Sequence, residues 1–175
     1  MAAIFELDEV EKLPLRAQAL IASRMARRAI LHLPREFSEG DRQAMLALCD
    51  ALDRAAATGD LDPTALDEVI ERALATRGGP AGEAAEALYW AWDAAGAAIG
   101  ALDFPVDDIC IMSASNAIAS ASRTYGMTPL QAVIFAAADL DLLRFACKEA
   151  NVGFYDALGA GVMGRLPPVH PPDER

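Results

Sequence analysis

Residues 15–33 read LRAQALIASRMARRAILHL, a stretch that is mostly apolar and yet carries four arginines. Pro14 precedes it and Pro34 follows it, and proline is tolerated at the start of a helix but not in its interior. One side carries apolar residues at helical spacing, namely Leu15, Ala19, Ala22, Ala26, Ala29, Ile30 and Leu33. The other side carries Arg16, Arg24, Arg27 and Arg28, interrupted by Leu20 and Leu31. Because a helix that is apolar on both flanks is usually central, we predict that helix 14–33 lies at the centre of the fold.

The four arginines of helix 14–33 have two interpretations. Residues 1–35 hold six Lys and Arg against four Asp and Glu, whereas residues 36–175 hold nine against 22. The arginines can therefore form solvated or internal ion pairs with carboxylates from the rest of the chain. Asp139 is the first candidate, because it falls among apolar residues of helix 129–149 and a buried carboxylate needs a cation. We expect a structural pair there rather than a catalytic acid. The alternative is an anion-binding or partner-binding patch.

The remainder of the chain predicts more helices and no competing strand. The whole chain holds 38 alanines, and alanine is the strongest helix former. Caps, prolines and glycines place helices at about 6–12, 14–33, 39–58, 63–76, 81–101, 106–123 and 129–149, with a short last helix capped by Asn151. We predict an all-α fold with a single domain over 1–163, a bundle or a short curled stack of seven to eight helices. Residues 164–175 form a Pro-rich tail, which we expect to be extended or disordered.

Charge and composition exclude several classes of function. The net charge is −11 and the isoelectric point is near 4.5, which opposes binding to nucleic acid and to anionic membranes. The longest uncharged stretch, 14 residues before Arg123, is too short and too polar to span a bilayer. The N-terminus lacks the pattern of a signal peptide. Cys49, Cys110 and Cys147 have no metal-ligand spacing and are expected to be buried thiols in a reducing compartment. We therefore expect a cytoplasmic protein.

The helix at 81–101 contains the only unusual aromatic cluster, EAAEALYWAWD. Leu88, Trp92, Ala95 and Ile99 share one face and are expected in the core. Trp90 falls on another side, together with Glu83, Glu86 and Asp93. These four residues are called the Trp90 face below. A tryptophan among carboxylates is typical of an interface anchor, whereas the simpler interpretation is that Trp90 packs under a neighbouring helix of its own chain.

The sequence offers little catalytic chemistry. His32 ends an arginine-rich helix and His170 lies in the tail, and neither has an orienting carboxylate nearby in sequence. There is no GxSxG, no HExxH, and no glycine-rich loop in a strand–helix context. We therefore assign no catalytic residue, no cofactor and no metal.

Residues 23–61 together with the alanine-rich stretch 79–102 resemble the Imm-5-type immunity proteins of bacterial polymorphic-toxin systems and related alanine-rich helical proteins. The resemblance covers about residues 15–150 and rests on the alanine pattern and the order of the helices. Met25 stands where a cysteine is common, and His32-Leu33-Pro34 replaces a proline–aromatic end. The resemblance implies an all-helical protein that neutralises a partner, and it implies no particular site residues.

We expect a non-catalytic protein–protein interaction module of the bacterial cytosol, of immunity or escort type, that binds a basic partner through the Trp90 face. Full burial of Trp90 would exclude this interpretation. Two alternatives remain open. One is a helical bundle that binds a small molecule or anion, or that is catalytic, through the arginines of helix 14–33. The other is a homo-oligomeric scaffold, which helix faces of small residues exposed as a large apolar patch would favour.

Overall fold

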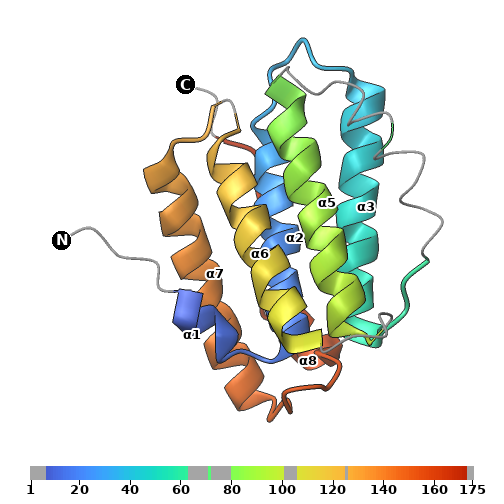
Figure 1. Ribbon diagram of the computed structural model, residues 1–175, viewed down its shortest axis with the longest axis vertical. Helices are drawn as coiled ribbons and strands as arrows, with labels where there is room; N and C mark the ends of the chain where they lie inside the picture. Colours follow the sequence, from blue (N-terminus) through green and yellow to red (C-terminus); the bar gives the residue numbers. More distant parts are fainter. Residues whose placement is uncertain (1–6, 63–70, 72–79, 101–105, 125, 173–175) are drawn as a thin grey trace.

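The fold is all-α, as predicted. The computed structural model describes residues 7–62, 71, 80–100, 106–124 and 126–172, and within these it contains helices and no strand. The helices are α1 (Leu7–Glu11), α2 (Leu15–Leu31), α3 (Glu39–Thr58), α5 (Pro80–Ala98), α6 (Val106–Ser122), α7 (Pro129–Glu149) and α8 (Gly159–Met163). The long helices stand side by side as a bundle (Figure 1). The helix predicted at 63–76 lies outside the described residues, apart from Glu71.

Local capping explains where α3 and α7 begin and end. The Ser38 side chain accepts a hydrogen bond from the backbone N–H of Asp41 at the start of α3, and Gly59 ends that helix with a φ of 89°. Thr128 starts α7 with a complete capping box, since its side chain and that of Gln131 each bond the other's backbone N–H. These signals lie within a few residues of each helix end, so the sequence reveals them without knowledge of the fold.

The role predicted for Asn151 is wrong. Asn151 does not cap the last helix, which begins eight residues later at Gly159, but ends α7. Its φ is 52°, its N–H bonds the Lys148 carbonyl, and the next N–H, of Val152, bonds the Cys147 carbonyl. This pair of bonds is a Schellman motif, in which asparagine substitutes for the usual glycine because it tolerates the left-handed conformation. The same residue type suits both ends of a helix, and the sequence interpretation chose the wrong one.

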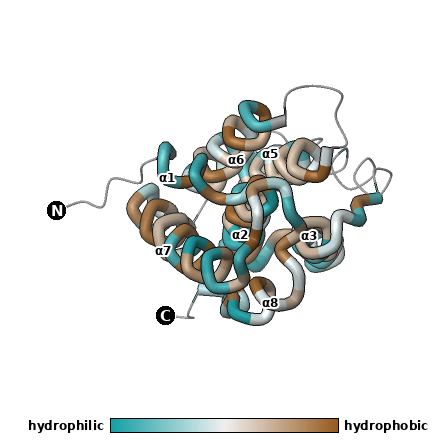
Figure 2. The backbone as a smooth tube through the Cα atoms, turned by 90° about the horizontal axis from the view of Figure 1, so that it is seen from below, coloured by the Kyte–Doolittle hydropathy of each residue, from teal (hydrophilic) through white to brown (hydrophobic). Residues whose placement is uncertain are grey.

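Helix α2 is the centre of the bundle, as predicted. It is enclosed by α3, α5, α6, α7 and α8 (Figure 2). Fourteen of its 17 residues are buried, including Arg24 and Arg28. Both of its flanks therefore meet protein. A central helix with this little solvent contact requires small residues that let neighbouring helices approach closely.

Alanine meets that requirement. The helices packed on α2 present alanines toward it, and α5 alone buries Ala81, Ala84, Ala85, Ala87, Ala91, Ala94, Ala95, Ala97 and Ala98. Leu88 is also fully buried, whereas Trp92 and Ile99, which we expected in the core, are only partly buried.

No helix among the described residues is long and apolar enough to cross a membrane. The three cysteines are buried, and burial raises the pKa of the Cys49 and Cys110 thiols to about 12.

Because the helices pack closely around α2, we predict that a larger side chain on its buried surface destabilises the fold. Ala22 has no exposed surface, so Ala22→Leu must displace neighbouring helices, and we expect the free energy of unfolding to fall by about 1–3 kcal/mol. Ala47 is exposed on α3 and supplies the matched control, because Ala47→Leu adds the same atoms to a solvated site. Urea denaturation monitored by circular dichroism measures both. Equal stability of the two variants would contradict the close packing of α2.

Candidate functional site

Two buried arginines of α2 share one buried carboxylate of α7. Arg24 donates from Nε to Asp139 Oδ1 at 2.8 Å, and Arg28 donates from Nη2 to the same oxygen at 3.0 Å and from Nη1 to Oδ2. Arg24 is 7% exposed, Arg28 8% and Asp139 1%. The pair expected between Asp139 and the arginines of helix 14–33 is therefore confirmed. It joins residues more than 100 positions apart and holds α7 against α2.

The neighbours of this cluster also come from α2 and α7. The guanidinium of Arg28 lies over the Phe135 ring, 4.9 Å from its centroid. This is a cation–π interaction, which stabilises the positive charge of Arg28. His32, one turn beyond Arg28, donates from Nδ1 to the Arg28 carbonyl oxygen at 2.7 Å. Residues 24, 28 and 32 are spaced four apart, so they form one stripe along α2.

Arg27 points to α3 instead. Its Nη2 donates to Asp50 Oδ1 and to Asp53 Oδ2, both at 2.8 Å, and Ser23 donates to the other Asp53 oxygen at 2.7 Å. Burial raises the pKa of Asp53, and the Arg27 charge opposes that rise. Arg24, Arg27 and Arg28 are thus all paired with internal carboxylates, which is the first of the two interpretations considered for them.

Arg16 is separate from the other three arginines. It lies beside the end of α3, where a Cβ added to Gly59 would come within 3.1 Å of Arg16 Nη1. Gly59 combines this close approach with a positive φ, so both the guanidinium and the backbone require glycine there. The Arg16 Nε and Nη1 atoms are buried without a hydrogen-bond acceptor. The four arginines therefore do not form one patch.

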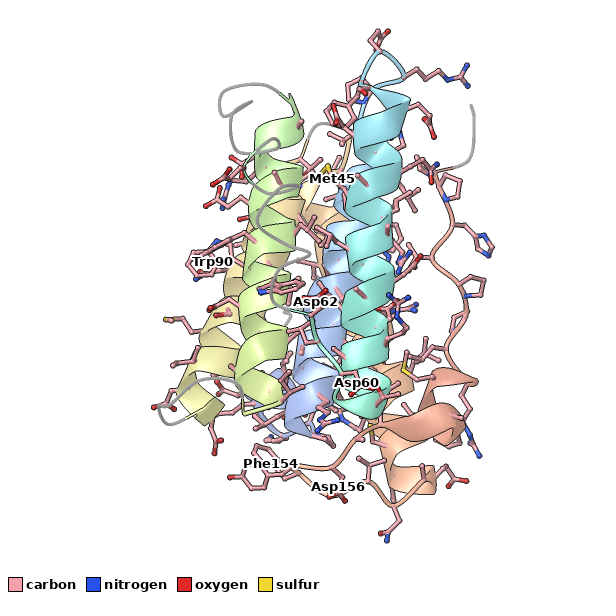
Figure 3. All side chains as sticks on the ribbon, turned by 90° about the vertical axis from the view of Figure 1, so that its right-hand side faces the viewer. Met45, Asp60, Asp62, Trp90, Phe154 and Asp156 are labelled. Carbon is pink, nitrogen blue, oxygen red and sulfur yellow. The ribbon has the colours of Figure 1, made fainter. Side chains whose placement is uncertain are left out.

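A cleft opens over the Arg24–Asp139–Arg28 cluster. Its volume is about 850 Å³, and its walls are α2, α7 and residues 167–172 of the C-terminal segment. This segment has no helix or strand and runs from α8 along the bundle beside α3 (Figure 3). Arg24 Nη1 donates to the Pro167 carbonyl at 3.0 Å. A smaller cavity of about 260 Å³ adjoins the same segment, and its charged lining residues are Arg24, Arg27, Asp50 and Asp53, so Arg24 borders both cavities.

The Trp90 face lies on the outside of α5 and toward α6. Trp90 projects from the side of α5 that faces away from α3 (Figure 3) and is half-buried. Arg123, just past the end of α6, donates to Glu83 at 3.0 Å and lies 3.8 Å from Glu86. Ser113 of α6 donates to Asp93. Both expectations for Trp90 are partly met, since it packs at the edge of the core and still reaches solvent.

Two exposed features escaped the sequence interpretation. Tyr89 is 40% exposed and packs edge-on against Trp90, with ring centroids 5.2 Å apart. A row of exposed apolar residues also runs along α7, and we call it the α7 row: Leu130, Ile134, Ala138, Leu142 and Phe145. Leu142 is one of the apolar residues near Asp139 on this helix, yet it is exposed and lies at the rim of the cleft. The four-residue spacing was visible in the sequence, but every face of α7 contains apolar residues and the pattern alone does not show which one is covered.

No cluster of three or more His, Cys, Asp or Glu side chains with the geometry of a metal site occurs in the part of the chain that the structure describes. Comparison of the chain with protein-family models, with curated proteins and with solved structures finds no match in any of the three. The features of the molecule that bear on its function are the cleft, the Trp90 face and the α7 row.

We predict that removing the charge of Asp139, the carboxylate that Arg24 and Arg28 share, causes a large loss of stability. Asp139→Asn leaves two buried guanidinium groups without a counter-charge, and we expect the free energy of unfolding to fall by about 3–5 kcal/mol. Asp141→Asn is the matched control, since Asp141 is exposed on the same helix and bonds Arg144 only at 3.5 Å. We expect it to change stability by about 0–1 kcal/mol. Chemical denaturation measures both, and similar losses would contradict a special role for Asp139.

Proposed function

We propose that this protein is a non-catalytic protein-binding module that holds a basic segment of a partner protein on the Trp90 face. The observation that carries the proposal is a partly exposed tryptophan, supported by a second exposed aromatic ring, among carboxylates that outnumber their cations. Each part of this arrangement has a recognised role at protein interfaces.

The aromatic pair supplies the anchor. Trp90 packs against the core on one side, which restricts its rotamers, while Tyr89 contacts its ring and extends into solvent. A rigid aromatic side chain loses little conformational entropy on binding, and tryptophan is enriched among the residues that dominate binding energy.

Charge supplies the specificity. Glu83, Glu86 and Asp93 face a single arginine, Arg123, so the surface keeps an excess of negative charge. Glu83 and Glu86 remain more than one third exposed while they share it. The whole chain carries −11, so a basic partner would also be attracted over longer distances. The resemblance to immunity proteins of toxin systems points to the same class of partner, for example a basic toxin domain.

The test begins with affinity capture from the native host, followed by titration of the purified partner. We expect Trp90→Ala to raise the dissociation constant at least about thirtyfold, as the loss of a binding hot spot would. We expect Glu83→Gln with Glu86→Gln to raise it less and to weaken its dependence on salt. Isothermal titration calorimetry at two salt concentrations measures both effects.

Trp92→Ala is the matched control, because Trp92 is also half-buried on α5. It is expected to leave the dissociation constant within about threefold. Circular dichroism of each variant establishes that it is folded. An acidic partner, or equal effects of the two tryptophan variants, would contradict the proposal.

The α7 row favours a second candidate, self-association. Its spacing reads almost the same in both directions about Ala138, so an antiparallel second copy would place Leu130 against Phe145 and Ile134 against Leu142. The small Ala138 would meet its own copy, where helices approach most closely. The row extends over about 22 Å of helix, and four of its side chains are among the large exposed apolar residues of the described chain.

A single charge in the α7 row is expected to abolish this association. Ile134 is 53% exposed at the row and Met112 is 52% exposed outside it, so Ile134→Glu and Met112→Glu form a matched pair. We expect the wild type and Met112→Glu to shift from monomer to dimer as concentration rises, and Ile134→Glu to stay monomeric because burying its carboxylate is costly. Sedimentation velocity measures the mass. A wild type that is monomeric at every concentration would exclude this candidate.

A further inference from the structure

The cleft beneath the C-terminal segment is independent of the Trp90 face and has the size of a small-molecule site. Its volume of about 850 Å³ falls within the range usual for ligand pockets, about 300–1,000 Å³. Its floor is the Arg24–Asp139–Arg28 cluster, and Phe135, Leu142 and Val169 add apolar wall. The cleft therefore combines a charged floor with walls that suit a carbon skeleton.

The charged floor of the cleft is one side of a larger ion-pair cluster. Among the described residues that line the cleft, the side chains with a fixed charge are Arg24, Arg28 and Asp139. Arg24 also lines the smaller cavity, together with Arg27, Asp50 and Asp53, and Arg27 bonds both of those aspartates. The three arginines and three aspartates therefore balance over the two cavities, but within the cleft itself two guanidinium groups face a single carboxylate.

Each of the two arginines also has a hydrogen-bond donor that no described residue accepts. Arg24 uses Nε for Asp139 and Nη1 for the Pro167 carbonyl, and Arg28 uses Nη1 and Nη2 for Asp139. Arg24 Nη2 and Arg28 Nε have no acceptor among the described residues, and neither atom is sealed from solvent. Guanidinium donors bind carboxylate and phosphate oxygens in preference to neutral acceptors, since the bonds are charge-assisted.

We propose that this cleft binds a small organic anion, a carboxylate or a phosphate ester with an apolar or aromatic body, whose charged group lies against Arg24 and Arg28. The anion accepts hydrogen bonds from Arg24 Nη2 and Arg28 Nε, and its body packs on Phe135 and Leu142 under the C-terminal segment. Asp139 remains in place and orients both arginines toward the ligand.

Three probes that share a phenyl ring and differ in their head group test the charge and the source of the anion. Phenyl phosphate, benzoate and neutral benzyl alcohol are each titrated into the full-length protein, with binding followed by calorimetry and by the shift in unfolding temperature. We expect saturable millimolar or tighter binding of at least one anion and at least about tenfold weaker binding of the alcohol. The ratio of phosphate to benzoate affinity then assigns the ligand class. Binding of neither anion, or equal binding of the alcohol, overturns the proposal.

A carboxylate placed inside the cleft is the decisive variant. Val169 is half-buried at the cleft wall and outside every helix, so Val169→Glu adds an internal anion without touching the buried ion pairs. We expect it to weaken anion binding at least about tenfold. Ala119→Glu, on an exposed position of α6, adds the same charge away from the cleft and is expected to bind as the wild type does. Equal affinity of the two variants overturns the proposal, whatever the outcome for the Trp90 face.

Discussion

The structure depends on the burial of two arginines in a central helix. Helix α2 is enclosed on nearly every side, yet Arg24 and Arg28 lie within its buried length. An unpaired charge in that position would destabilise the fold by several kcal/mol, so α7 must bring Asp139 to one place on α2. The same cluster captures the C-terminal segment through the Pro167 carbonyl. One electrostatic requirement therefore positions α7 and the chain end, and it also creates the cleft between them.

Alanine makes this arrangement possible and determines where larger residues remain. Alanines on α5 and α6 let those helices pack closely on α2, and they leave little room in the core for tryptophan, tyrosine or phenylalanine. The large side chains consequently gather at the edges, in the Trp90 face and in the α7 row. The same composition that explains the fold thus concentrates the features suited to binding on two surfaces of the bundle.

The charges are sorted between the inside and the outside of the bundle. Arg24 and Arg28 are buried with Asp139, whereas Arg27 pairs nearer the surface with Asp53 and the exposed Asp50, and many of the remaining carboxylates lie at the surface. An outer surface of this kind attracts basic partners, whereas the cleft presents two guanidinium groups and one carboxylate. Protein binding at the Trp90 face would then use the outer carboxylates, and anion binding in the cleft would use the buried arginines.

Local and periodic patterns in the sequence determined the all-α fold, the starts of α3 and α7, the central place of α2 and the need of Asp139 for a cation. These follow from interactions within one helix or from the requirement that a buried charge be paired. Only the tertiary structure decided that Arg16 stands apart beside Gly59, that Arg24 and Arg28 share one carboxylate, and that residues 167–172 complete a cleft. It also decided which apolar side of α7 stays exposed. The physical reason is that these features depend on which remote segments pack together, and helical periodicity shows that a face is apolar without showing what covers it.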